Sequence, residues 1–526
     1  MMGAKPLWDR VKAGARQQAE ETEATVILKE KNQGADEIEE LLAGLNFCFD
    51  SDGVVGNAEK ADEAEMGPAA GQQAKVAEER LPVVQASADA PDDIDLINKE
   101  FFIAPDGSGK PTIWQEQSDP ETGHARLTAI SVGEFKLLLS NRFAEYHAPT
   151  GMRRVPLAEA WLRSERRRQF LGGIALVPDG TPKPDVFYLF KGFAVAPSEG
   201  DATLALEHVR MLCSGNAELA EYFLNAMALI VQRPGTRLEV ALVLRGAQGT
   251  GKGTLFRMLG KIFGRHFLHI TNSRHLVGNF NSHLRHALVV FVDEGYWAGD
   301  KSAEGVLKGL ITEPSVAIEM KGRDVFMAPN RITVFMASNN AFVVPAGADE
   351  RRYFVVDVPP SRAQDHAYFG KLNEWIDSGG AGIFLRHLLD RELKGFNPRA
   401  VPHTSALDSQ KIENMPALDR WILDALDTAT SLGGGNEWGE ERVAIECGMA
   451  AEGYEAYCRR AGIRAGRIDT RAIGRRLHEA FGCGPASATV GSRVSRRRAW
   501  SLPGLSEARQ MAASAFGLRN YGWGQA

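Results

Sequence analysis

One loop constrains the fold of this chain more than any other stretch. Residues 237–244 are apolar and β-branched, and they lead into the glycine-rich run Gly246-Ala247-Gln248-Gly249-Thr250-Gly251-Lys252-Gly253-Thr254, after which a helical pattern begins at Leu255. Glycines let consecutive backbone N–H groups turn inward around a phosphate, a helix N-terminus adds positive potential, and a lysine neutralises phosphate oxygens. This order of strand, loop and helix predicts a P-loop NTPase core, which is an α/β domain built on a parallel sheet.

The residue after Lys252 departs from the usual form of this loop. Gly253 stands where a Ser or Thr usually binds Mg²⁺, and Thr254 follows one position later. Nucleotide kinases carry the same GxxGxGKGT form, so the loop alone does not separate a hydrolase from a kinase. It predicts ATP and Mg²⁺ as cofactors, and leaves open whether Thr254 or a water completes the metal site.

Two later apolar segments end in polar residues that suit hydrolysis. Residues 287–292 are followed by Asp293 and Glu294. An aspartate at this point would hold Mg²⁺, and the glutamate would orient and polarise an attacking water, which a kinase must exclude. Residues 331–337 lead to Asn339, which would sense the γ-phosphate if its strand is inserted between the first two.

Two adjacent arginines, Arg351 and Arg352, precede a fourth apolar segment at residues 355–358. They could pair with the preceding acidic residues. In a ring-shaped ATPase, one of them would instead reach the γ-phosphate of the neighbouring subunit as an arginine finger. The sequence favours the finger without choosing between the two.

A basic hairpin is expected between Glu294 and Asn339. Residues 316–320 and 325–327 alternate around a glycine-containing turn that carries Lys321 and Arg323. Such a tip could contact the phosphates of single-stranded DNA, although an inert surface hairpin would have the same pattern.

The segments GAQGTGKGT, FNSHLRHALVVFVDE, LKGLITEPSVAIEMKGRDVFMAPN, ITVFMASNN and GADERRYFVVDV, in this order, resemble a superfamily 3 helicase, and more narrowly the helicase part of phage and plasmid primase-helicases. The resemblance covers residues 237–359 strongly and residues 96–234 weakly. It implies an AAA+-like domain, a homo-oligomer that forms a hexameric ring, and ATP-driven unwinding of forked DNA during replication of a phage, prophage or plasmid.

The resemblance also implies roles by position. It places Lys252 and Thr254 in the phosphate loop, Asp293 and Glu294 at the magnesium and water site, Asn339 at the sensor, Lys321 and Arg323 in the DNA-contact hairpin, and Arg351 or Arg352 at the finger. Larger relatives have an N-terminal primase-polymerase domain. Because the residues ahead of the folded region here are few and acidic, priming would fall to a separate primase or polymerase.

The rest of the chain divides by composition. Residues 1–94 form an acidic arm and linker that we expect to be largely disordered, and residues 95–234 form a lead-in domain that we expect to be mainly helical with some strands. The ATPase domain is assigned to residues 235–362, a helical extension to residues 363–430, and a basic winged-helix-like α+β domain to residues 440–515.

The basic character of the last domain is local. Eleven arginines lie between residues 459 and 498 against two acidic residues, whereas the whole chain has a net charge of -6. Helices near residues 450–461 and 470–481 followed by strands near 488–494 and 497–502 suit a winged helix. A solvated basic surface is the alternative to DNA contact by the residues Arg471, Arg475, Arg476, Arg493, Arg496, Arg497 and Arg498.

Composition limits the remaining possibilities. The five cysteines are scattered and outside any CxxC pair, which favours reduced thiols, and no apolar run approaches the length of a membrane span. We therefore expect a cytoplasmic protein without a membrane partner. Two rival functions stay open: a nucleotide kinase, and a DNA-binding switch ATPase for origin recognition or loading that does not unwind DNA.

Overall fold

The computed structural model describes residues 93–524, with gaps at residues 119–124, 149–150, 179–181, 273, 279, 295–300, 321, 323, 434, 464–468, 484–487, 491–496 and 520. The arm and linker assigned to residues 1–94 therefore lie outside the described residues, except that residues 93 and 94 begin helix α4 (Asp93–Glu100). None of the helices in the described part of the chain has both the length and the apolar character of a membrane span.

The described part of the chain contains a five-stranded parallel sheet, as the glycine-rich loop predicted. Its strand order is β14-β8-β13-β10-β9, so β13 is inserted between β8 and β10, the arrangement expected for the strand that leads to Asn339. The strands are β8 (Ala241–Arg245), β9 (Phe267–Ile270), β10 (Val289–Asp293), β13 (Thr333–Ser338) and β14 (Tyr353–Asp357).

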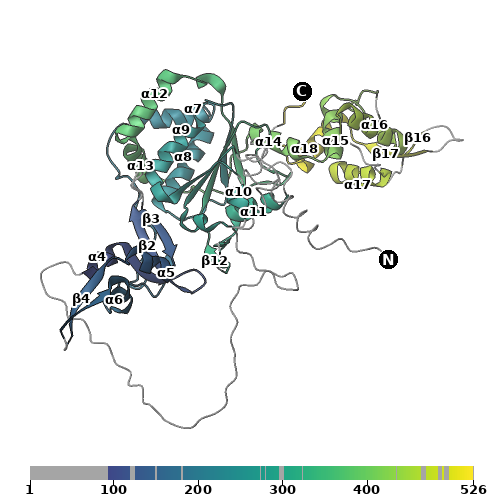
Figure 1. Ribbon diagram of the computed structural model, residues 1–526. Coiled ribbons are helices and arrows are strands. Elements are labelled where there is room, and N and C mark those ends of the chain that lie inside the picture. The colour runs from purple at the N-terminus through teal and green to yellow at the C-terminus, as the bar shows by residue number, and fades with distance from the viewer. Residues whose placement is uncertain are drawn as a thin grey trace, which may run out of the picture. The chain divides into compact units, whose positions relative to one another are not determined.

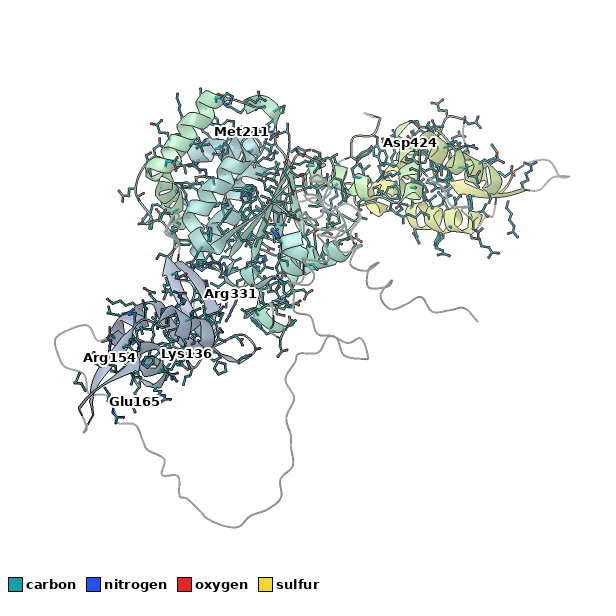
Figure 2. All side chains as sticks on the ribbon, viewed as in Figure 1. Lys136, Arg154, Glu165, Met211, Arg331 and Asp424 are labelled. Carbon is teal, nitrogen blue, oxygen red and sulfur yellow. The ribbon has the colours of Figure 1, made fainter. Side chains whose placement is uncertain are left out.

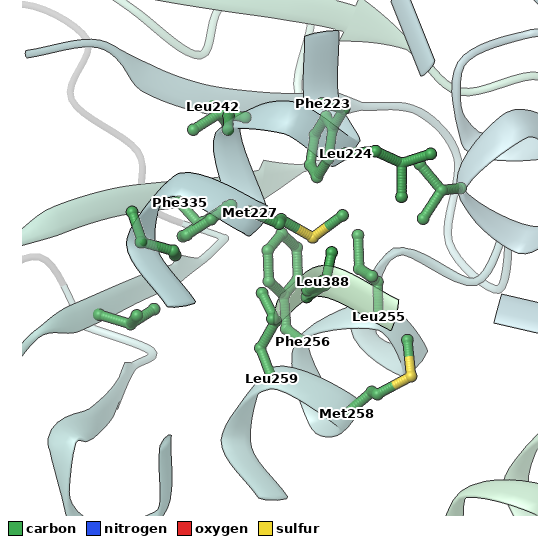
Figure 3. Close-up of a cluster of buried hydrophobic side chains, with 14 of the residues drawn as sticks. Phe223, Leu224, Met227, Leu242, Leu255, Phe256, Met258, Leu259, Phe335 and Leu388 are labelled. Carbon is green, nitrogen blue, oxygen red and sulfur yellow. The ribbon is translucent and has the colours of Figure 1, made fainter. Parts of the chain in front are cut away.

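Both faces of this sheet are covered, which explains why its strands read as continuous apolar runs. Along β8, Leu242 and Leu244 belong to one core cluster and Ala241 and Val243 to another. Figure 3 shows the first cluster, in which Phe256 of α9 packs beside Phe335 of β13, with the ring centroids 5.6 Å apart.

Helices lie on the two sides of the sheet (Figure 1). The first core cluster includes side chains of α7, α8, α9 and α13, and the second includes side chains of α11 and α14. The bounds are α7 (Thr203–Leu212), α8 (Ala217–Gln232), α9 (Lys252–Phe263), α10 (Arg274–Val277), α11 (Lys301–Thr312), α12 (His366–Trp375), α13 (Ala381–Asp390) and α14 (Ser405–Asn414).

Helices from both sides of the expected domain boundaries at residues 234 and 362 pack against the sheet. Helices α7 and α8, which we assigned to the lead-in domain, pack against the sheet because their apolar faces share its first core cluster. The segment 363–430 is helical as expected, but it is not one unit. Its helix α13 joins the first cluster, α14 the second, and α15 (Ala417–Asp427) the core of the C-terminal region.

The lead-in region assigned to residues 95–234 contains both helices and strands, and its strands lie between residues 101 and 188. Antiparallel strands β1, β2 and β3 form one sheet and β4 and β5 a hairpin. Both sides of β1 and β2 are buried, since Phe101 and Ile113 belong to one core cluster and Phe102 and Trp114 to another. Charged side chains such as Lys136 and Arg154 lie along this region (Figure 2). The elements are β1 (Phe101–Pro105), β2 (Pro111–Ser118), β3 (Ala125–Ile130), α5 (Val132–Leu138), β4 (Phe143–Ala148), β5 (Gly151–Pro156), α6 (Leu157–Arg163), β6 (Ile174–Ala175) and β7 (Phe187–Tyr188).

The C-terminal region has its own core, built around Trp438, Ile473 and Phe516. It has the α+β composition expected of a winged-helix-like domain, with two helices followed by a β-hairpin. The first strand, which has only four residues, and the last helix, α18, were not predicted from the sequence. The elements are β15 (Val443–Glu446), α16 (Cys447–Arg460), α17 (Thr470–Phe481), β16 (Ala488–Val490), β17 (Arg497–Leu502) and α18 (Leu505–Ala515).

Candidate functional site at the carboxyl edge of the sheet

The glycine-rich loop connects the carboxyl end of β8 to the first turn of α9. Gly249 and Gly251 have φ angles of 76° and 92°, in the left-handed region that favours glycine. Gly251 is followed directly by Lys252, the first residue of α9. The Thr250 hydroxyl donates to the carbonyl of Ala247 at 2.9 Å, so the loop is fixed from within.

Lys252 lies folded into this loop. Its Nζ donates to the carbonyl oxygens of Gly246 at 2.6 Å and Ala247 at 2.8 Å, and the residue is 8% exposed. Burial lowers the pKa of the Lys252 ammonium, and the carboxylates of Glu294 and Asp293 oppose that shift. The loop thus holds a cation at the centre of the edge, within the electrostatic reach of both acidic residues.

Helices α7 and α12 contact the loop at Gly251, and the sequence did not predict these contacts. His208 of α7 has one ring nitrogen, Nε2, 3.1 Å from the Gly251 carbonyl oxygen and the other, Nδ1, 3.2 Å from the Tyr368 hydroxyl. A Cβ added to Gly251 would lie 2.6 Å from the Phe369 ring. Sequence spacing carried no signal for these contacts, because they join residues between 43 and 160 positions apart.

The chemical state of His208 follows from its surroundings. Burial lowers the pKa of His208 to about 4, so the ring is neutral near neutral pH. A carbonyl oxygen only accepts hydrogen bonds, so Nε2 carries the proton and donates to Gly251, while Nδ1 accepts from the Tyr368 hydroxyl.

The predicted acidic pair and the predicted sensor lie at the same edge. Asp293 is paired in register with Ala337, two residues before Asn339, across adjacent strands. Glu294 adopts a φ of 56°, and its N–H donates to the Ala337 carbonyl at 2.9 Å. A left-handed backbone is uncommon for a residue other than glycine, and such conformations gather at functional sites. Glu294 and Asn339 are both exposed.

The residues available to a divalent metal are oxygen donors, as Mg²⁺ prefers. Asp293 has a side chain that is 37% exposed and lies 3.4 Å from His269 of β9. A Cβ added to Gly253 would meet nothing within 4 Å, so the position that lacks a hydroxyl opens onto free space. The side-chain hydroxyl nearest in sequence to Gly253 is that of Thr254, in the first turn of α9.

The structure distinguishes the two arginines ahead of β14. The Glu350 carboxylate, whose side chain is 4% exposed, accepts from the backbone N–H groups of Arg351 at 3.1 Å and Arg352 at 2.8 Å. It also pairs with the Arg352 guanidinium at 3.4 Å. The Arg351 side chain is exposed.

The expected hairpin is present as antiparallel strands β11 (Ser315–Ile318) and β12 (Phe326–Pro329). Its two basic residues, Lys321 and Arg323, lie outside the described residues. The hairpin rests on the lead-in region, since Arg285 stands over both the Trp114 ring, at 5.4 Å, and the Phe326 ring, at 5.5 Å.

The arginines of the C-terminal region differ in their surroundings. Arg471 and Arg475 lie exposed one turn apart on α17. The Arg476 guanidinium binds Asp419 through two hydrogen bonds at 2.5 and 2.9 Å, and its side chain is only 24% exposed. Arg497 pairs with Glu446 at 2.9 Å and Arg498 is exposed, whereas Arg493 and Arg496 lie outside the described residues.

Comparison with solved structures gives the fold class. The apo structure of the NrS-1 C-terminal region aligns with 77% of this chain and 97% of its own length, at a TM-score of 0.54 and 19% identity. Its A form aligns with 78% and 98% respectively, at a TM-score of 0.54 and 18% identity. The chain therefore shares the fold of that region, a mixed α/β architecture with a parallel sheet.

Sequence comparison finds relatives of residues 244–352. The model of a family of unknown function, DUF5906, matches residues 244–352, which run from the end of β8 to Arg352. The chain is also 31% identical over 138 residues to the DNA primase-polymerase of Nitratiruptor phage NrS-1. That alignment covers 26% of this chain and spans only 19% of the relative's length.

Proposed function

We propose that this chain is a Mg²⁺- and ATP-dependent DNA helicase of superfamily 3 that works in the replication of a phage, prophage or plasmid. The observation that carries the proposal is the convergence of Lys252, Asp293, Glu294 and Asn339 at one edge of a sheet ordered β14-β8-β13-β10-β9. Similarity to a phage DNA primase-polymerase supports a role in phage DNA replication.

Each residue has a chemical task in this proposal. The backbone N–H groups of the loop and the Lys252 ammonium bind the β- and γ-phosphates of ATP. Asp293 and Thr254 hold Mg²⁺, which neutralises charge on the phosphate oxygens. Glu294 accepts a proton from the attacking water, and Asn339 orients that water against the γ-phosphate.

In a ring, the neighbouring subunit would contribute the finger, and we assign that role to Arg351. Its guanidinium is exposed, whereas that of Arg352 is engaged by Glu350. A free guanidinium can move onto a phosphate without first breaking an ion pair. The hexamer belongs to this proposal, as do single-stranded and forked DNA as the track.

The first test is steady-state ATP hydrolysis with and without single-stranded DNA. Lys252→Ala is expected to lower kcat by about 100-fold or more, because the charge on the γ-phosphate loses its partner. Lys261→Ala, on an exposed part of the same helix, is the matched control and is expected to keep the rate. A rate of ATP hydrolysis that single-stranded DNA does not change would contradict the proposed translocation on DNA.

A DNA-binding switch ATPase is the second candidate, and the separate C-terminal region with exposed Arg471 and Arg475 favours it. Strand displacement on a forked duplex separates the two. A helicase releases the labelled strand only with ATP, whereas a switch binds the duplex and releases none. Phosphoryl transfer from ATP to AMP without DNA would instead support a nucleotide kinase.

A further inference from the structure

Helix α14 buries an unusual number of polar side chains for its length. Asp408, Gln410 and Lys411 are 3%, 0% and 6% exposed, and Thr404, which caps the helix, is 7% exposed. Buried polar groups cost free energy unless they are hydrogen-bonded, so the partners of these side chains show what the helix holds in place.

The partners of Gln410 lie in a single segment, residues 341–346, which we call the connecting segment. Its Oε1 accepts from the N–H groups of Val343 at 2.7 Å and Val344 at 3.2 Å, and its Nε2 donates to the Ala341 carbonyl at 2.6 Å. One turn further along α14, Asn414 Nδ2 donates to the Ala346 carbonyl at 3.1 Å. The connecting segment therefore gets side-chain hydrogen bonds from one face of α14.

This segment has no regular secondary structure, yet it lies between two residues of the candidate site. It begins two residues after Asn339 and ends five residues before Arg351. Val343, Val344 and Ala346 are fully buried in the second core cluster. Because both ends of the segment lead to exposed site residues, a shift of the segment would move Asn339 and Arg351 together.

Helix α14 is itself anchored at two further points. The Thr404 hydroxyl donates to the Val355 carbonyl of β14 at 2.7 Å. The Lys411 Nζ donates to the Gly517 carbonyl at 2.6 Å, and a Cβ on Gly517 would lie 2.0 Å from the Ala348 carbonyl oxygen. The helix is thus fixed to the strand that follows the arginine pair and to a residue packed on the loop that precedes it.

We infer that Gln410 is a positioning residue for hydrolysis, which acts through the connecting segment to hold Asn339 and Arg351 in place. It contacts no nucleotide in this scheme, so it would affect the rate of the chemical step and leave nucleotide binding by the loop at Lys252 unchanged. This inference rests on the proposed ATPase function.

The test measures kcat for DNA-stimulated hydrolysis and the Kd for a fluorescent ATP analogue on the full chain. Gln410→Met removes all three hydrogen bonds and is expected to lower kcat about 10- to 100-fold, with Kd changed by less than about twofold. Asn414→Ala, on the exposed end of the helix, tests the same segment without risk to the core and is expected to lower kcat by a smaller factor. Glu413→Gln, exposed on the same helix, is the control and is expected to match the native chain.

A double variant separates positioning from general destabilisation. If Gln410 acts through Asn339 and Arg351, then adding Gln410→Met to the double variant Asn339→Ala/Arg351→Ala causes no further loss of activity, because both affected side chains are already absent. Multiplicative losses, equal losses in kcat and ATP affinity, or a native kcat in Gln410→Met would overturn the inference. A native chain as inactive as Lys252→Ala would instead reject the proposed ATPase, and the inference with it.

Discussion

The carboxyl edge of the sheet and the arginine-rich C-terminal region were both predicted from sequence, but they differ in what a sequence can reveal. At the edge, strand order and backbone path bring Lys252, Asp293 and Asn339 together. Asp293 ends β10, Asn339 directly follows β13, and Lys252 begins the helix that the glycine-rich loop joins to β8. In the C-terminal region, the role of an arginine depends on whether a distant carboxylate reaches it. Asp419 lies 57 positions from Arg476 and yet binds it.

The position of a residue relative to a strand can be predicted from nearby sequence. Whether a surface arginine is already paired with an acid cannot, because that acid can be distant in sequence. Local counting gave a strongly basic patch. The structure separates Arg476, whose half-buried guanidinium binds Asp419, from the exposed arginines Arg471, Arg475 and Arg497. The predictions that follow test each side of this contrast.

The largest effect is expected at the edge of the sheet. Glu294→Gln keeps the size of the side chain but removes the proposed base, so kcat should fall by about 100- to 10,000-fold while ATP still binds. Rapid-quench hydrolysis and equilibrium binding of a fluorescent ATP analogue would check this. Glu313→Gln, at the exposed end of α11, is the control. Equal losses of binding and rate would contradict the role assigned to Glu294.

An intermediate effect is expected on stability, where substitution of Arg476 should differ from substitution of the other arginines of α17. Arg476→Met leaves the Asp419 carboxylate, 11% exposed, without its partner, and is expected to reduce the free energy of unfolding by about 3 kcal/mol. Arg471→Met and Arg475→Met should leave thermal stability unchanged. Differential scanning calorimetry would measure the difference.

DNA affinity should depend on the arginines that stability does not depend on. Each of Arg471→Met and Arg475→Met is expected to weaken duplex binding and to lower the slope of log K against log salt concentration by about 1, as for a lost phosphate contact. Fluorescence anisotropy at several salt concentrations would measure both. Native salt slopes in both variants would argue for a solvated basic surface.

The smallest effect concerns pH. Burial lowers the pKa of His208 and His266 to about 4 from the usual 6.5, so the unfolded chain binds these protons more readily than the folded one. Stability from these residues is therefore complete above pH 6.5 and is lost as the pH falls towards 4. Between pH 7 and pH 6, each should cost about 0.7 kcal/mol.

Chemical denaturation followed separately in two parts of the chain would test this. Both histidines belong to the sheet and its helices, so a probe there should show the loss of stability at pH 6. The C-terminal core, followed by a probe near Trp438, serves as the internal comparison. His208→Phe is expected to reduce the pH dependence. An identical dependence in that variant would assign the effect to other groups.

The sequence predicted the sheet well because its strands are buried on both faces and each site residue follows one of them. The inserted position of β13 and the bounds of α17 (Thr470–Phe481) agree with expectation. The strand pairing of the lead-in region could not be predicted, because turns interrupt its alternating pattern. His208 and Gln410 were not identified because their contacts join residues distant in sequence, which no local spacing records.

The insertion of β13 between β8 and β10 has a consequence for how this chain is made. The strand that carries the glycine-rich loop has β13 on one side and β14 on the other, and both are synthesised after the hairpin of β11 and β12. Until Ser338 has left the ribosome, both edges of β8 lack their partners, and the edge that pairs with β14 stays open until Asp357 has also emerged. A nascent or truncated chain that stops short of β13 would hold the loop residues without a sheet to support them, and would expose two apolar strand edges to its neighbours.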